Sequence, residues 1–105
     1  MTFADNLKTL PPVDTVQRIE LRTDSGKTVG IIENKPGQQG SLAVYNHLLS
    51  QFGRISVEAA QEGLRLYAEH TEDARQYPGK HPNIDRLLQV QSTQEGLEGA
   101  IVGRH

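Results

Sequence analysis

Cysteine and tryptophan are missing from this chain of 105 residues, and aromatic side chains are scarce, with three tyrosines and two phenylalanines. Without cysteine the protein has no disulfide framework and no thiolate for catalysis or metal binding. The few aromatic residues are also too scattered to form the stacking platforms on which many proteins bind RNA. The fold must therefore depend on a small core of aliphatic side chains.

Neither sign of charge dominates, because 11 lysines and arginines stand against 13 acids and give a formal net charge of −2. A nucleic-acid-binding surface needs a concentrated positive excess, so we expect no nucleic-acid partner. The chain has no apolar run of about eighteen residues, which predicts that it does not span a membrane. Its first residues, MTFADNLKTLPP, include an acid and no long apolar run and do not resemble a signal peptide. Together these features predict a cytoplasmic protein.

The length and the apolar content of 35% indicate one domain over residues 1–105 with a single small core. Domains of this size are often only marginally stable on their own. We therefore expect a homo-oligomer in which Tyr67, Tyr77 or the terminal strand contacts a second copy.

The first part of the chain predicts a β-hairpin. Apolar and polar residues alternate over 16–22, as expected for a half-buried strand. The sequence DSG at 24–26 supplies turn chemistry, and residues 27–32 provide a second strand. Before the hairpin, residues 2–10 predict a short helix that two prolines end.

Two helices are predicted after a glycine-rich loop. Apolar residues recur at helical spacing over Leu42–Phe52, with Ser41 as the N-cap and Gly53 just past the end. A second apolar stripe predicts one continuous helix over Val57–Gln76, capped by Ser56. Because the connection between them is short, the two helices are expected to form an αα-hairpin.

The tail of the chain allows two interpretations. Leu87–Gln91 and Leu97–Val102 are either two strands joined across residues 92–96, or a helix followed by one strand. The β-branched residues and the spaced glycines favour the hairpin. The expected fold class is therefore α+β, an antiparallel sheet of two β-hairpins with the αα-hairpin packed on one face.

The loop from Lys35 to Ser41 is the first candidate binding site. A strand, glycines and a helix N-terminus in this order offer free N–H groups and a positive helix end to an anion. Gly37 and Gly40 allow close approach to a ligand, and Lys35 adds a charge. The loop has neither the P-loop nor the dinucleotide-binding spacing. We predict weak anion binding by these four residues, the alternative being a plain connection.

A second candidate site consists of Glu69, His70, Asp73, His81 and Asp85. On a helix, His70 and Asp73 lie within one turn of each other, and a turn at 78–82 would have to fold His81 back onto them. Either histidine is then a candidate general acid or base, oriented by Glu69 or Asp73. The alternative is an ordinary solvated acidic face. The sequence contains no metal-binding signature such as HExxH, and we expect no metal and no cofactor.

Three segments, ENKPGQQGSLAVYNHL, LRLYAEHTEDAR and PGKHPNIDRLL, resemble a family of small bacterial proteins, a domain of unknown function. The resemblance covers most of the chain and implies that both Pro/Gly loops belong to a family pattern. It implies no activity, cofactor or catalytic residue. The leading hypothesis is a small binding or interaction module for an anion or a protein partner. The alternative is a small enzyme that uses His70 or His81.

Overall fold

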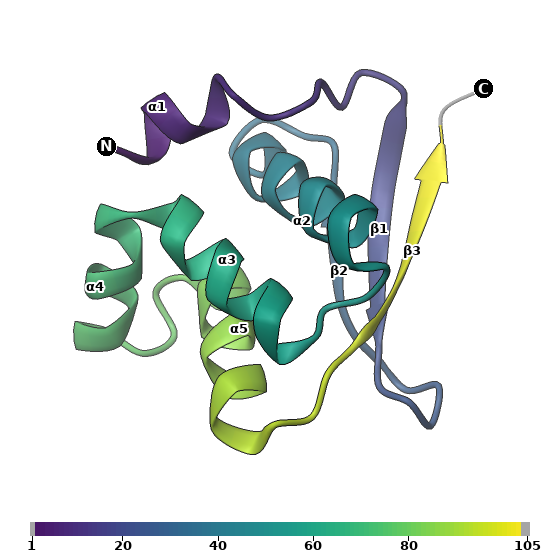
Figure 1. The fold of residues 1–105 in the computed structure, drawn as a ribbon. Coiled ribbons are helices and arrows are strands. Elements are labelled where there is room, and N and C mark those ends of the chain that lie inside the picture. Colours follow the sequence, from purple (N-terminus) through teal and green to yellow (C-terminus); the bar gives the residue numbers. More distant parts are fainter. Residues whose placement is uncertain (1, 104–105) are drawn as a thin grey trace.

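The structure, a computed structural model, describes residues 2–103. In chain order its elements are α1 (Phe3–Leu7), β1 (Val16–Arg22), β2 (Thr28–Glu33), α2 (Gln39–Phe52), α3 (Val57–Tyr67), α4 (Glu69–Gln76), α5 (Pro82–Thr93) and β3 (Glu98–Gly103). The helices lie on one face of a single antiparallel sheet (Figure 1). This arrangement confirms the predicted α+β class. None of the described helices is long and apolar enough to cross a membrane.

The sheet has three strands in the order β2-β1-β3, so β1 is the central strand. The predicted hairpin is confirmed, since β1 pairs antiparallel with β2 across a turn in which Gly26 adopts a φ of 92°. Ile19 of β1 lies opposite Ile32 on one side and Ile101 on the other. Ile19 and Leu21 point toward the helices and are fully buried.

The predicted second hairpin is wrong. Leu87–Gln91 belongs to α5, so β3 pairs with β1 and not with a preceding strand. The helix forms because Ile84, Leu87 and Val90 recur every third residue and bury one stripe against the rest of the core. Pro82 also occupies the first helical turn, where its missing N–H costs nothing.

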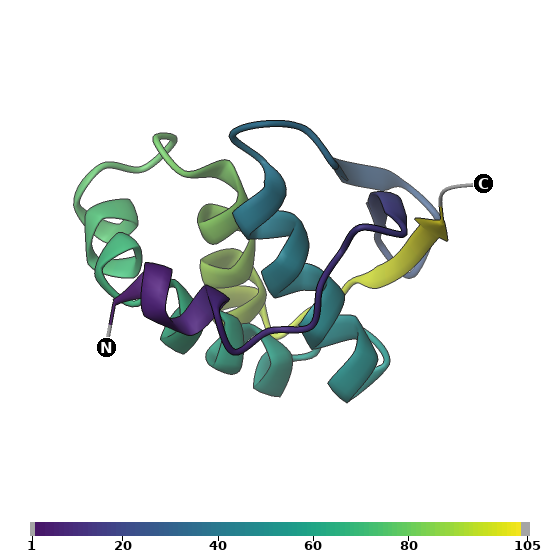
Figure 2. The same ribbon diagram turned by 90° about the horizontal axis from the view of Figure 1, so that it is seen from above.

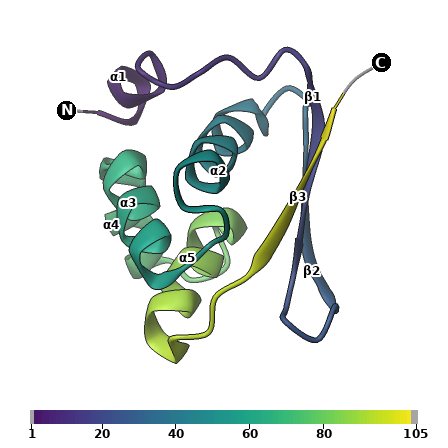
Figure 3. The same ribbon diagram turned by 45° about the vertical axis from the view of Figure 1, so that its right-hand side comes forward.

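The helices form two layers over the sheet. Helix α2 contacts β1 and β2 directly, whereas α3 packs against α2 and α5 and lies farther from the sheet (Figure 3). The predicted αα-hairpin of α2 and α3 is therefore present, and it contacts the sheet through α2. The largest fully buried side chains are Tyr45, Ile19, Leu21, Ile32, Leu42, Leu48, Ile55, Leu87 and Val44.

The helix predicted over Val57–Gln76 is broken at Ala68, where φ is 53°. Two buried polar side chains take the backbone carbonyls that precede the break. Asn6 donates from Nδ2 to the carbonyl of Leu66 at 2.9 Å, and Thr71 donates from its hydroxyl to the carbonyl of Leu64 at 2.6 Å. These bonds satisfy carbonyls at a helix end that would otherwise be buried without partners.

Several predicted helix boundaries can be compared with the structure. Ser56 caps α3 by accepting a hydrogen bond from the N–H of Ala59, and Gly53 ends α2 with a φ of 79°, so both predictions are confirmed. Asn83 lies inside α5, and His81 occupies the N-cap position of that helix.

Candidate functional site

Ser41 is not the N-cap of α2, contrary to the prediction. The helix begins at Gln39, because a turn at Gly37, with a φ of 88°, brings the chain into helical geometry three residues earlier than expected. Ser41 therefore lies in the first turn of the helix. Its Oγ is 2.7 Å from the hydroxyl of Tyr67, which donates to it. This contact uses a group that was predicted to bind a ligand.

The other groups of the predicted anion loop are also largely engaged with the chain. The Lys35 ammonium lies 2.9 Å from a Glu33 carboxylate oxygen. The ring of Phe3 covers Gly40 so closely that a Cβ at this position would be 3.1 Å from it. A Cβ at Gly37 would meet no atom within 4 Å. Anion binding by this loop thus stays a prediction, with one open glycine rather than four free groups.

The structure does bring the second candidate cluster together. His81 Nε2 lies 2.7 Å from Asp73 Oδ2, and the ring centres of His70 and His81 are 5.7 Å apart. Asp73 Oδ2 also forms an ion pair with Lys80 Nζ at 2.9 Å. The hydrogen bond from His81, followed by that from Lys80, lowers the pKa of Asp73 below its usual value. Glu69 does not join them, because its carboxylate accepts the N–H of Phe3 at 2.8 Å.

The surroundings of this cluster are aromatic rather than hollow. His70 meets the ring of Phe3 edge-on at 5.2 Å, and Phe3 stacks on Tyr67 at 5.1 Å. The side chains of Asp73 and His81 are 32% and 24% exposed. Among the described residues, no group of three or more His, Asp or Glu side chains is arranged to hold a metal ion. The cluster is therefore a surface His–Asp pair beside a row of rings.

A large groove, which the sequence did not indicate, lies between the hairpin and α5. Its volume is about 1170 Å³, and it is lined by residues 23–27, part of β2, residues 54–58, and α5 with the segment that follows it. Helix α5 faces the lower part of the hairpin across this region (Figure 3). The lining mixes charged, hydroxyl and aliphatic side chains, as in sites that orient a ligand by a few polar groups.

Arg86 of α5 enters this groove in a fixed position. Its guanidinium packs against β2 at Gly30, where a Cβ would lie 2.4 Å from Nη2. Nη1 donates to Asn83 Oδ1 at 2.8 Å and more weakly to the Tyr45 hydroxyl at 3.4 Å. The guanidinium carbon also lies 5.8 Å from the centre of the Tyr45 ring. A glycine in the strand is therefore required for the arginine to occupy this position.

Within residues 2–103, Arg86 forms no ion pair with an acid. Among these residues, the one buried side-chain polar atom without a hydrogen-bond partner is His47 Nδ1. The Nε and Nη2 donors of Arg86 bond to no acceptor within the same range, and neither atom is fully buried. On a guanidinium these two donors are spaced to receive two oxygens of a carboxylate or phosphate.

Three other charged groups of the groove are held by neighbours. Arg54 contacts Asp24 at 3.0 Å and Glu98 at 3.2 Å. The Asp85 carboxylate accepts the N–H of Gly79 at 2.8 Å. Arg86 differs from Arg54 because its partners are neutral and leave its charge uncompensated.

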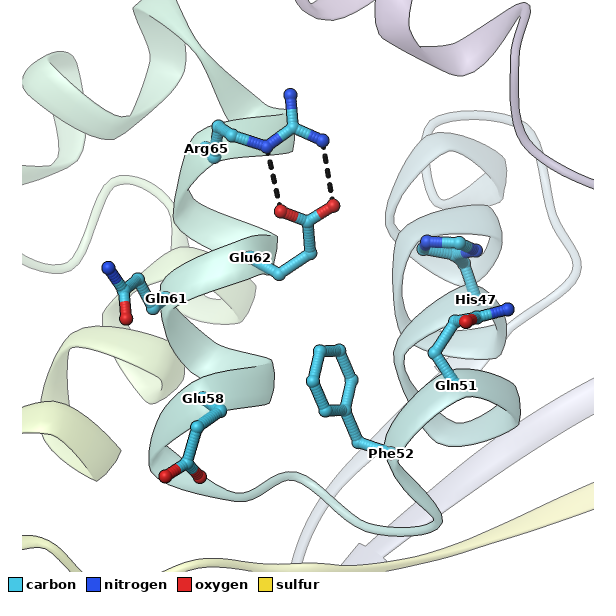
Figure 4. Close-up of a pocket in the computed structure, with 7 residues that line it drawn as sticks. All are labelled: His47, Gln51, Phe52, Glu58, Gln61, Glu62 and Arg65. Atoms are coloured by element: carbon cyan, nitrogen blue, oxygen red, sulfur yellow. Dashed lines mark hydrogen bonds and ion pairs between the residues drawn. The ribbon is translucent and has the colours of Figure 1, made fainter.

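A smaller hollow of about 490 Å³ lies between α2 and α3 (Figure 4). Arg65 and Glu62 face each other across two hydrogen bonds of 2.7 Å, and these bonds lower the pKa of Glu62. Phe52, 40% exposed, lies between the two helices beside His47. The arginine of this hollow is paired with an acid, so the groove at Arg86 is the stronger ligand site.

One local signal for Arg86 was present in the sequence. Gly30 falls at an inward-facing position of β2, opposite the buried Leu21. A glycine at such a position indicates that another group approaches the backbone closely. The group itself lies on a distant helix, and nothing near Arg86 in the sequence identifies it as that group.

The model of a protein family described as uncharacterized and conserved in bacteria (DUF2322) matches residues 3–100. No curated protein and no solved structure matches the chain. The family match confirms the resemblance inferred from the three sequence segments, and the description of the family names no activity.

Proposed function

We propose a function from the geometry of the groove alone, because the chain belongs to the bacterial family DUF2322, which is described as uncharacterized. The protein is a binding module that holds the anionic group of a small molecule or peptide at Arg86. The observation that carries this proposal is a half-buried guanidinium, held by neutral neighbours in the groove of about 1170 Å³, with no acceptor bonded to Nε or Nη2 within residues 2–103.

The charge of Arg86 explains why an anion suits this site. A partly buried cation is costly unless it is paired, and the described part of the chain supplies no acid to pair with it. An oxyanion accepting from Nε and Nη2 forms the two-pronged hydrogen bond for which the guanidinium is preorganised. One such contact in an open groove corresponds to a dissociation constant on the order of millimolar for a bare ion.

Amide and arginine side-chain NMR shifts, followed during titration with inorganic phosphate and separately with acetate, test this function. We expect shifts at Gly30, Asn83 and the Arg86 Nε–H, with saturation at millimolar concentration. Whichever anion binds more tightly identifies the ligand as a phosphate or a carboxylate. Arg86→Gln should abolish the shifts. Arg65→Gln, which changes an exposed arginine already paired with an acid, should leave them intact.

Two results would contradict the proposal. In the first, phosphate and acetate shift the same resonances in Arg86→Gln as in the wild type. In the second, the shifts concentrate at residues 37–43, which would favour the loop at the start of α2. Arg86→Lys adds a finer test, because it keeps the charge and loses the planar fork. We expect this variant to bind about tenfold more weakly.

A second candidate function is acid–base catalysis by His81, which the 2.7 Å contact with Asp73 favours. A carboxylate that orients a histidine in this way is a common element of catalytic sites. Chromogenic esters and phosphomonoesters test this alternative. Turnover should be lost in His81→Gln and in Asp73→Asn and kept in His47→Gln. Turnover that is equal in all four proteins, or absent from all, would remove it.

A further inference from the structure

The terminal strand β3 is the most exposed element of the sheet. All six of its residues are exposed or half-buried, although it pairs with the central strand along its whole length. Ile101 lies opposite the fully buried Ile19 and is still 43% exposed. One edge of β3 contacts β1, and the other faces outward at the side of the molecule (Figures 1 and 2). The outer edge therefore carries unpaired backbone groups beside apolar side chains.

The two edges of the sheet differ in how they are protected. Strand β2 contains an irregularity at Val29, where two residues of β1 pair across a three-residue span of β2. Bulges of this kind disturb an edge and hinder its pairing with another strand. The ladder between β3 and β1 is also irregular, but there the extra residue lies in β1, between Val16 and Arg18. Strand β3 itself has no bulged residue and no charged side chain after Glu98, so its outer edge is less protected than that of β2.

The sequence of β3 also suits antiparallel pairing with a second copy of the same strand. From Gly99 to Gly103 it reads GAIVG, with Ile101 at the centre, an alanine and a valine beside it, and glycines at the ends. Two antiparallel copies of such a sequence bring isoleucine opposite isoleucine and glycine opposite glycine. This pattern indicates a second copy of the chain as the partner, because an unrelated strand would not require it.

We propose that β3 pairs antiparallel with β3 of a second copy, centred on Ile101. The result is a symmetric dimer with one six-stranded sheet in the order β2-β1-β3-β3-β1-β2. The two Ile101 side chains meet on the helix side of the sheet, and Gly99 lies opposite Gly103 of the other copy. Ala100 lies opposite Val102 of the other copy on the outer face. The main-chain hydrogen bonds supply affinity, and the central isoleucines fix the register.

Sedimentation velocity over a concentration series provides the first test. A single strand pair is a small interface, so we expect a dissociation constant on the order of 100 µM. Ile101→Lys should weaken the dimer at least about tenfold, because it places two like charges opposite each other. Ile31→Lys is the matched control, since Ile31 is 52% exposed on the other edge strand. Circular dichroism should show that both variants remain folded.

Single-cysteine variants provide an independent test, because the natural chain contains no cysteine. Under mild oxidation Ile101→Cys should form a disulfide-linked dimer much faster than Ile31→Cys. A wild-type protein that stays monomeric at millimolar concentration overturns the proposal. A dimer that Ile31→Lys disrupts and Ile101→Lys does not would also overturn it, since the β2 edge would then be the interface.

Discussion

The loop before α2 and the groove beside α5 carry similar chemical groups, but the fold uses them differently. In the loop, Ser41 accepts a hydrogen bond from Tyr67, and Phe3 covers Gly40. In the groove, Gly30 leaves room for Arg86, whose charge no described acid neutralises. A side chain is therefore available to bind a ligand only where neighbouring groups of the chain do not already bond to it or cover it.

Each region is anchored by one buried tyrosine. Tyr67 donates its hydroxyl to Ser41 beside the loop, and Tyr45 donates its hydroxyl to the backbone carbonyl of Asn83 at 2.5 Å beside the groove. Burial raises the pKa of Tyr45 to about 12, and burial also raises the pKa of Tyr67. The two hydroxyls thus offer a direct way to perturb the two regions separately.

The largest expected effect is a loss of stability at alkaline pH. An unfolded tyrosine ionises near pH 10, whereas Tyr45 in the folded protein stays neutral to about pH 12. The folded state therefore keeps the Tyr45 proton to a higher pH than the unfolded state does. The stabilisation that this provides is complete below pH 10 and is lost as the pH rises from 10 to 12. We expect Tyr45 to account for a fall of about 2–3 kcal/mol in the unfolding free energy.

Urea unfolding between pH 9 and 12 measures this effect. Tyr45→Phe should remove one part of the pH dependence, and Tyr67→Phe another. If Tyr45→Phe shows the same pH dependence as the wild type, the Tyr45 hydroxyl of the wild type is not held in a buried environment.

A smaller effect is expected when the loop is released. Tyr67→Phe removes the donor that occupies Ser41 and should cost about 1 kcal/mol of stability. It also frees the serine hydroxyl, so phosphate should shift the amides of residues 37–43 more strongly in this variant than in the wild type. Tyr45→Phe is the control, since it leaves Ser41 occupied. Equal shifts in both variants would mean that Tyr67 does not limit the loop.

The smallest effect on stability is expected at Gly30, together with a clear effect on binding. In Gly30→Ala the new methyl group takes the position of the Arg86 guanidinium, which can move because it is the end of a flexible side chain. Stability should change by less than about 1 kcal/mol, and oxyanion affinity should fall roughly tenfold. Gly40→Ala, which contacts Phe3 instead, should leave the affinity unchanged when phosphate binding is followed by NMR.

Local patterns were sufficient where the determinants are local. The alternation over 16–22 and the turn at Gly26 predicted the hairpin, and Ser56 and Gly53 marked real helix ends. The tail was ambiguous because Leu87 fits both a strand and a helical stripe. The contacts of Leu87 with the core decide between them, and the sequence does not show these contacts.

The features that were missed depend on distant partners. Ser41 has the preference of an N-cap, but its hydroxyl is taken by Tyr67, which lies on another helix. Arg86 looks like an ordinary surface arginine until β2 places Gly30 against it. The proximity of His70 and His81 was predicted on the condition that the turn at 78–82 folds back, and the structure meets that condition.

The break at Ala68 has a consequence for how the protein folds during synthesis. Asn6, which holds the carbonyl of Leu66, is separated from it by 60 residues, and Phe3 is separated from Glu69 by 66. The N-terminal segment leaves the ribosome first, yet these partners do not exist until most of the chain has been made. The bend between α3 and α4 is therefore fixed late, by a segment that is synthesised about sixty residues earlier.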